Sequence, residues 1–176
     1  MLLSKKTSIK ISCEYANLIG HMCYAASKLW NVCNYERQHY KETGLVQYPD
    51  WYYQKKAHKE DLWYKQLPSQ TAQEVCKLLD KAWKSFYALK RSGGIESPRP
   101  PRFKQEGIPI TYMQMGIVHE RDTEKVRLSL PKALKNIWKE HIRSMKTFFF
   151  LKIRFSGTWI RSNSCGSTRR RKGSVT

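Results

Sequence analysis

Acidic residues are scarce in this sequence of 176 residues, which contains 14 Asp and Glu against 33 Lys and Arg and has a formal net charge of +19. Such a cationic chain repels itself unless a polyanion neutralises it. Nucleic acid is the usual polyanion, and an acidic membrane surface is the alternative, which we do not favour because no predicted helix combines a lysine-rich face with a bulky apolar face free of core contacts. The few carboxylates are scattered, whereas metal-assisted hydrolysis needs them clustered. We interpret the densest acidic group, residues 120–124, as a hairpin turn. We therefore expect RNA and DNA as partners and no catalytic residue.

Other functional signatures are absent as well. The five cysteines form no Cys-x-x-Cys pair and the five histidines show no ligand spacing, so we expect neither a metal site nor a cofactor. No nucleophile–base arrangement is indicated, and we expect no small-molecule substrate. No apolar run approaches a membrane span, and an odd cysteine count without a secretory leader favours a cytoplasmic location. Nothing in the sequence decides the oligomeric state.

The clearest positive pattern lies between Ser69 and Lys90. At 3.6 residues per turn the apolar positions share one face of a helix, namely Ala72, Val75, Leu79, Ala82, Phe86 and Leu89. The opposite face carries three lysines, Lys77, Lys81 and Lys84. Each lysine is a candidate contact to phosphate, and a merely solvated face is the alternative. Ser69 is the candidate N-cap, and Gly93-Gly94 is expected to end the helix.

A basic, proline-rich segment follows this helix. The Pro98–Pro101 cluster forces an extended chain, along which Arg99, Arg102 and Lys104 are spaced. We expect these three side chains to track RNA phosphates, because the prolines preorganise the segment. Aromatic rings beside basic residues elsewhere, such as Trp63, are either core residues or platforms on which bases stack.

The remaining periodicity predicts an α+β fold. We expect strands at residues 2–12, 110–115, 126–130 and 148–155, and helices at 17–40, 50–58 and 131–141, with Asp50 as an N-cap. This order describes a β-domain that is interrupted by a helical insertion. Its expected parts are a first strand at 1–14, the helical insertion at 15–94, the rest of the β-domain at 95–160 and a disordered basic tail at 161–176.

Six short motifs occur in an order that is typical of one protein family. They are Leu29-Trp30-Asn31, Tyr40-Lys41-Glu42-Thr43-Gly44, Pro68-Ser69-Gln70 with Leu79 to Tyr87, Pro101-Arg102-Phe103-Lys104, Ile110 to Gln114, and Val126 to Lys132. By their order and spacing, residues 1–155 resemble the N-terminal part of the OrfB/TnpB proteins of bacterial and archaeal insertion sequences. Those proteins are RNA-guided DNA endonucleases that are often described as transposases.

The resemblance implies a split architecture and a set of DNA contacts. The strands would form a small, wedge-type β-barrel and the inserted helices a recognition lobe, which together hold a guide RNA and read a short DNA motif. On the family pattern, Tyr48, Gln73 and Gln114 align near positions that face this motif, although Met113 replaces an expected polar residue. Glutamine can form two hydrogen bonds to adenine in the major groove. A solvated polar residue is the alternative for these glutamines.

The sequence also departs from the family. Its members continue into a RuvC-like domain with three carboxylates that bind two metal ions, and with a zinc ribbon, and neither is present here. The stretch after Trp159 fails to follow the family and changes to Ser- and Arg-rich sequence. We therefore expect a truncated protein that binds nucleic acid but is no enzyme by itself. The alternatives are a stand-alone DNA-binding regulator, such as a repressor, and half of a nuclease that a second chain completes.

Overall fold

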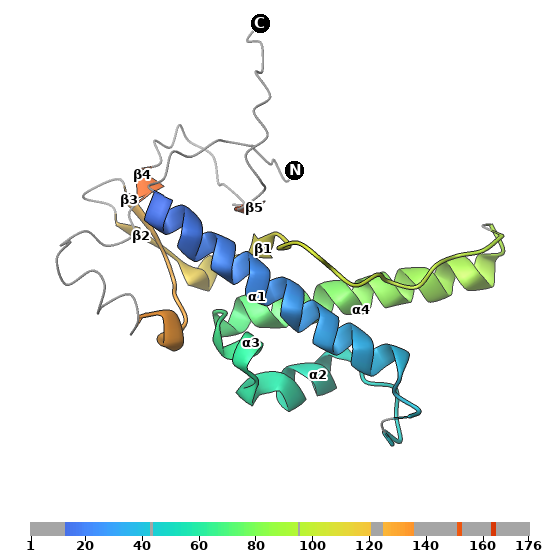
Figure 1. Ribbon diagram of the computed structural model, residues 1–176. Coiled ribbons are helices and arrows are strands. Elements are labelled where there is room, and N and C mark those ends of the chain that lie inside the picture. The colour runs from blue at the N-terminus through green and yellow to red at the C-terminus, as the bar shows by residue number, and fades with distance from the viewer. Residues whose placement is uncertain are drawn as a thin grey trace, which may run out of the picture.

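Two long helices dominate the computed structural model, which describes residues 13–42, 44–94, 96–120, 125–135, 151–152 and 163–164. Helix α1 spans Cys13–Gln38 and helix α4 spans Ser69–Ser92, and the two helices cross (Figure 1). The short helices α2 (Trp51–Ala57), η1 (His58–Glu60) and α3 (Leu62–Lys65) connect them and pack beside the crossing. The predicted helices at 17–40, 50–58 and 69–90 are thus confirmed, with small shifts at their ends.

The helix ends show which capping predictions were right. The side chain of Asp50 accepts a hydrogen bond from the backbone N–H of Tyr53 at 2.8 Å and so caps α2, as expected. Gly93 adopts a left-handed conformation with φ of 64° and ends α4, which only glycine does without strain. The expectation that Ser69 caps α4 was wrong, because Pro68 occupies the N-cap position and supplies no side-chain hydrogen bond.

The strands are short and form two antiparallel ladders. One pairs β1 (Ile110–Thr111) with β5 (Asn163–Ser164), and the other has the order β2 (Ile117–Glu120), β3 (Lys125–Leu128) and β4 (Leu151–Lys152). A 3-10 turn, η2 (Gln114–Gly116), interrupts the strand that was predicted at 110–115. Residues 132–135 form one helical turn. The predicted strand at 2–12, the rest of the predicted helix at 131–141 and most of the predicted tail lie outside the described residues.

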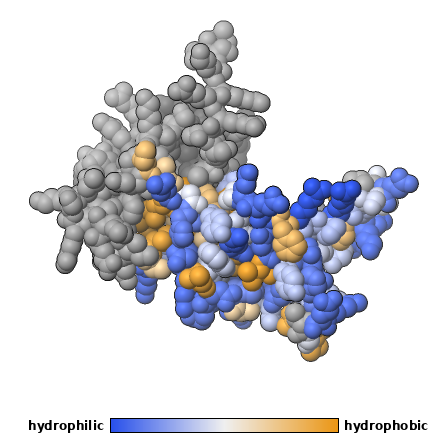
Figure 2. All heavy atoms as spheres, viewed as in Figure 1, coloured by the Kyte–Doolittle hydropathy of each residue, from blue (hydrophilic) through white to orange (hydrophobic). Residues whose placement is uncertain are grey.

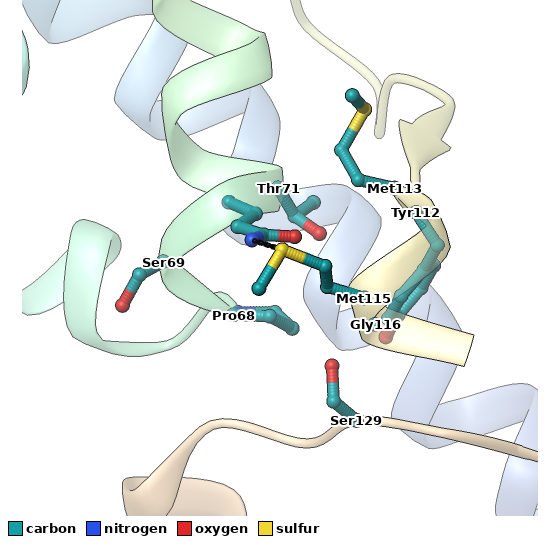
Figure 3. A pocket seen from close by; sticks show the side chains of 9 residues that line it. Pro68, Ser69, Thr71, Tyr112, Met113, Met115, Gly116 and Ser129 are labelled. Atoms are coloured by element: carbon teal, nitrogen blue, oxygen red, sulfur yellow. Dashed lines mark hydrogen bonds between the residues drawn. The ribbon is translucent and has the colours of Figure 1, made fainter. Parts of the chain in front are cut away.

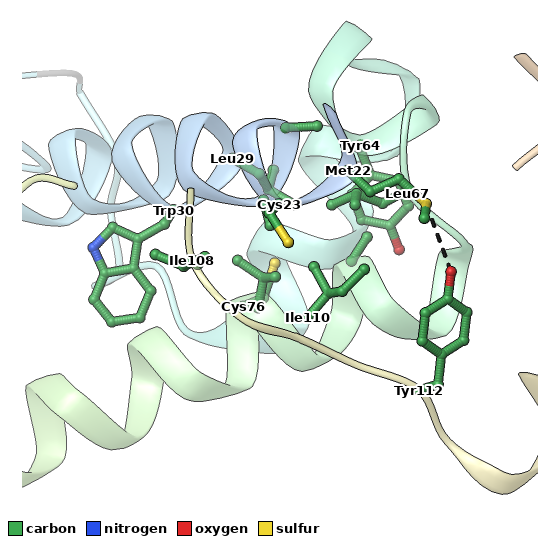
Figure 4. Packing of buried hydrophobic residues seen from close by; sticks show 14 of the residues in the cluster. Met22, Cys23, Leu29, Trp30, Tyr64, Leu67, Cys76, Ile108, Ile110 and Tyr112 are labelled. Carbon is green, nitrogen blue, oxygen red and sulfur yellow. Dashed lines mark hydrogen bonds between the residues drawn. The ribbon is translucent and has the colours of Figure 1, made fainter. Parts of the chain in front are cut away.

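The predicted small β-barrel was wrong, because the described part of the chain is mainly helical and its strands do not close into a barrel. The physical reason lies in residues 108–112. Ile108, Ile110 and Tyr112 alternate as in a half-buried strand, and all three side chains are buried. They point toward the space between α1 and α4, however, and not into a sheet (Figure 4). The pattern with period 2 therefore reflects an extended segment packed on helices.

The core lies where this extended segment meets the crossing of α1 and α4. Leu29 of α1 and Leu79 of α4 are fully buried, and removal of such a side chain typically costs about 2–5 kcal/mol. The hydroxyl of Tyr112 reaches the Sδ atom of Met22 at 3.6 Å (Figure 4). Gly107 permits the close approach of the extended chain to α1, because a Cβ atom there would lie 3.0 Å from the Cβ atom of Cys23. One hydrophobic core thus joins the helices to the segment that follows them.

Candidate nucleic-acid interface

The proline-rich residues 98–107, here called the basic strap, are held on α1 by polar side chains that bind the strap's backbone. The indole N–H of Trp30 donates to the carbonyl of Arg102 at 3.1 Å. The amide of Asn31 donates to the carbonyl of Lys104 at 2.8 Å and accepts from its N–H at 2.7 Å. These bonds use the backbone of the strap and leave the side chains of Arg99 and Arg102 exposed.

Asn34 links the basic strap to α4. Its Nδ2 group donates to the carbonyl of Pro101 at 2.9 Å, and its Oδ1 atom accepts from the indole N–H of Trp83 at 2.9 Å. Gln38, one helical turn further along α1, donates to the same Pro101 carbonyl at 3.3 Å. Because Trp83 of α4 and Pro101 of the strap both bind the side-chain amide of Asn34, the strap and the C-terminal half of α4 lie next to each other.

The cations of these two neighbouring elements are exposed to solvent. We define the basic region as Lys81, Lys84, Lys90, Arg91, Arg99, Arg102 and Lys104, each of which is an exposed residue. Figure 2 shows hydrophilic residues over the end of α4 and beside it. Two members have an intramolecular contact, since Lys84 pairs with Asp80 at 2.8 Å and the ammonium of Lys104 lies 5.1 Å from the ring centre of Trp30. The basic region is thus a concentrated positive surface on a fixed backbone.

One carboxylate next to this region, that of Asp80, is turned inward, whereas Glu96 and Glu106, beside and within the strap, are exposed. Asp80 of α4 forms a 2.9 Å ion pair with Arg37 of α1, and the two side chains are 8% and 1% exposed. Burial by itself would raise the pKa of Asp80, but hydrogen bonds from Lys84 and Arg37 outweigh it and hold the pKa below the usual range. Asp80 therefore stays ionised, and its charge serves the interior of the protein instead of opposing a bound phosphate.

The buried polar network continues from Arg37 to α2. The Nε atom of Arg37 donates to Gln54 at 2.9 Å, and Gln54 in turn donates to the carboxylate of Glu36 at 2.8 Å. The same carboxylate lies 3.2 Å from Nε2 of His58, whose Nδ1 lies 2.5 Å from Asp61. These contacts fix α1, α2 and η1 relative to one another. They also pair two more of the few acids, Glu36 and Asp61, with His58 within the protein.

The histidine of this network gives the fold a pH dependence. The hydrogen bond to Glu36, and less strongly that to Asp61, raises the pKa of His58 to about 9, against the desolvation that lowers it. Because the pKa of His58 is higher in the folded than in the unfolded protein, its protonation stabilises the fold. The stabilisation is complete below the unfolded-state pKa of about 6.5 and is lost as the pH rises through the folded-state pKa of about 9.

We expect the free energy of unfolding to fall by on the order of 1–2 kcal/mol between pH 6.5 and pH 9.5 because of His58, after allowance for solvent screening. Urea denaturation at several pH values, on the wild type and on His58→Gln, measures this contribution as the difference between the two curves. The curves should converge at high pH. Parallel curves across the whole range would show that His58 does not contribute in this way.

The structure separates the predicted phosphate contacts into two groups. Lys81, Arg99 and Arg102 are exposed and point away from the core, as a contact to a polyanion requires. Lys77 is only half-exposed, pairs with Glu74 at 2.7 Å and lies 4.9 Å from the ring centre of Trp51. The Lys77 ammonium therefore has partners within the protein and is less available to a phosphate than the exposed cations.

The predicted DNA-motif contacts do not gather at one point. Tyr48 packs its ring against three other aromatic rings and under the guanidinium of Arg37, and burial raises its pKa. Gln73 is half-buried on α4, close to the end where α4 contacts residues 111–115. Gln114 is exposed on η2. Only Gln114 among the three thus stands open to solvent.

A small cavity of about 130 Å³ lies at the N-terminus of α4 (Figure 3). Its lining includes Ser69 and Thr71 of α4 together with Tyr112, Met115 and Ser129 from the later part of the chain. The amide of Gln70 donates to the Sδ atom of Met115 at 3.3 Å across it. The cavity carries no basic side chain, so it lies apart from the basic region.

Sequence reasoning missed the side chains that hold the strap and the pairing of Arg37 with Asp80. Trp30, Asn31 and Asn34 do share a face of a predicted helix, which could have indicated a polar seam. Lys90 and Arg91 were also missed as candidate phosphate contacts. They lie in the last turn of α4, where basic residues are common because they interact favourably with the helix dipole.

The comparisons with known proteins add no relative. No protein-family model, no curated protein and no solved structure matches this chain. The resemblance to the OrfB/TnpB proteins therefore stays a prediction that depends on the six sequence motifs. Among the described residues, no three His, Cys, Asp or Glu side chains gather as a metal site would require. No described helix has the length and apolar character that a bilayer crossing demands.

Proposed function

We propose that this protein binds nucleic acid, RNA above all, through the basic region of α4 and the basic strap. The observation that carries the proposal is the fixed backbone of the strap, whose carbonyls at Pro101, Arg102 and Lys104 are bound by α1. Arg99, Arg102 and Lys104 are consequently spaced along an extended, exposed segment, as contacts to successive phosphates require, and the ammonium of Lys104 also lies near the ring of Trp30. The proposal is for binding, without a catalytic role for this chain alone.

Electrostatics supports the same function. The formal charge of +19 makes an isolated chain repel itself, and the basic region concentrates part of this charge on two adjacent elements. Asp80, the acid that lies closest in sequence to Lys81 and Lys84, is neutralised internally by Arg37. At this surface a polyanion would meet the seven cations of the basic region and two exposed acids, Glu96 and Glu106, beside and within the strap. The guide RNA that the OrfB/TnpB resemblance implies is one such polyanion, and a DNA strand is another.

The test compares two sets of charge removals. The first variant, Lys90→Gln/Arg91→Gln/Arg102→Gln, removes three positive charges from the basic region. The second variant, Lys41→Gln/Lys56→Gln/Lys59→Gln, removes three positive charges from exposed lysines outside the basic region. We expect the first variant to bind a single-stranded RNA at least about 10-fold more weakly than wild type at 150 mM salt, because its lost phosphate contacts supply most of the affinity. The second should stay within about threefold.

Equal losses in the two variants would contradict the proposal, since they would show that overall charge, and not this region, determines binding. Fluorescence anisotropy with a labelled RNA measures both. A labelled duplex DNA in the same assay separates an RNA-binding protein from a DNA-binding regulator, because a regulator should prefer the duplex. An RNA of scrambled sequence reports whether any one RNA is favoured.

A further inference from the structure

An open surface depression of about 400 Å³, here called the cavity, lies on the C-terminal half of α4, within the basic region. It is lined by Lys84, Tyr87, Lys90 and Arg91. Three cations therefore line it together with one aromatic residue, Tyr87, which is 40% exposed. Every nucleotide joins a flat base to a phosphate. An exposed aromatic ring can stack on the base, and cations that precede and follow the ring in the sequence can bind the phosphates.

The ring of Tyr87 is held firmly although it is partly exposed. Its centre lies 5.6 Å from that of Trp83 at an interplanar angle of 34°, and 6.2 Å from that of Tyr48 at 77°. Phe86 adds a third ring contact at 5.2 Å. Because these rings belong to the edge of the core, Tyr87 does not have to lose much freedom when a ligand stacks on it.

One cation of the cavity is also fixed in advance. The ammonium group of Lys84 is bound to Asp80 at 2.8 Å, and Asp80 is itself held by the buried guanidinium of Arg37. Lys90 and Arg91 stand in the last turn of α4 and are exposed. The cavity thus has an exposed cation that is paired with Asp80 at one end and two exposed cations in the last turn of α4 at the other.

We propose that this cavity binds one nucleotide of a single-stranded RNA, with its base stacked on Tyr87 and the adjoining phosphates held by Lys84 and by Lys90 with Arg91. The inference rests on the proposed function and adds to it a position at which the base itself is recognised. Stacking on an aromatic ring accepts any base, because every base has a π face. The cavity therefore favours single strands over duplexes, whose bases are already stacked on one another.

The test uses two oligonucleotides of equal length and charge, one with uracil bases and one with abasic residues at every position. The full-length wild type should bind the base-containing strand about 5- to 10-fold more tightly. Tyr87→Leu should lose this ratio, while Tyr87→Phe should keep it because it keeps the ring. Tyr35→Leu, at an exposed ring of α1 that stacks on His39, is the matched control and should also keep it.

The outcomes separate this inference from the proposed function. If the wild type binds both strands equally, or if Tyr87→Leu retains the ratio, the stacking inference is wrong. Salt-dependent binding to both strands would at the same time leave phosphate binding by the basic region intact. If Tyr87→Leu does not fold, photocrosslinking of wild type to an RNA with 5-iodouracil gives the answer. A crosslinked peptide that contains Tyr87 supports the inference, and crosslinks confined to other peptides overturn it.

Discussion

Asp80→Ala is expected to lower the free energy of unfolding by about 3–5 kcal/mol, because it leaves the guanidinium of Arg37 charged, buried and without its partner. The Arg37 side chain is 1% exposed, and its 2.9 Å ion pair with Asp80 joins α1 to α4 at the centre of the fold. The remaining hydrogen bond from Arg37 to Gln54 satisfies only part of that group. Urea denaturation followed by circular dichroism measures the change.

Two controls show whether the effect comes from the buried charge. Glu74→Ala removes the other acid of α4, whose partner Lys77 is half-exposed, and should cost no more than about 1 kcal/mol. The double variant Arg37→Met/Asp80→Leu removes both charges together, and it should be more stable than Asp80→Ala alone, since apolar side chains replace buried ion pairs well. A loss below about 1 kcal/mol in Asp80→Ala would mean that Arg37 is not buried as described.

Asn34→Leu is expected to have the second-largest effect, a loss of about 1–3 kcal/mol, since two groups lose their bond to Asn34 and only one of them, the Pro101 carbonyl, keeps another donor, Gln38. These groups are the indole N–H of Trp83 and the carbonyl of Pro101, both of which now bind the Asn34 amide at 2.9 Å. The variant should also release the basic strap from α4 and weaken RNA binding. Thermal denaturation and the RNA-binding assay measure the two effects separately.

Gln38→Ala is the matched control for this prediction. Gln38 also donates to the Pro101 carbonyl, but at 3.3 Å and from an exposed position, so its loss should cost less than about 1 kcal/mol. Hydrogen exchange at residues 102–104 should be faster in Asn34→Leu than in Gln38→Ala. If the two variants exchange alike, Asn34 does not hold the strap.

The long helices could be predicted from the sequence because their apolar periodicity is local. α4 was found from the repeat of Ala72, Val75 and Leu79, which the structure buries. The cap at Asp50 and the end at Gly93 follow from equally local chemistry. The strand expected at 110–115 was right only for Ile110–Thr111, and the alternate burial of Ile108, Ile110 and Tyr112 records only that one side of an extended chain is buried. It cannot tell a sheet from two crossing helices, and the β-barrel prediction failed for this reason.

The candidate site was predictable in part for a similar reason. Arg99, Arg102 and Lys104 could be identified because prolines next to cations indicate an extended, exposed chain. The partners of the strap's backbone come from α1, more than 60 residues earlier in the sequence, and no local pattern connects them. The inward turn of Asp80 likewise depends on where α1 crosses α4. Lys77 illustrates the opposite case, since a lysine on the polar face of a helix can be engaged by a neighbouring acid and ring.

The measurement that tests the central claim most directly is the salt dependence of RNA binding, for wild type and for Lys90→Gln/Arg91→Gln/Arg102→Gln. For single strands, the slope of log affinity against log salt changes by about 0.7 for each phosphate contact. If the basic region holds the phosphates, wild type should show a slope steeper than about −2, and the triple variant a slope flatter by about 2. A variant slope equal to that of wild type, or a wild-type slope near zero, would contradict the account.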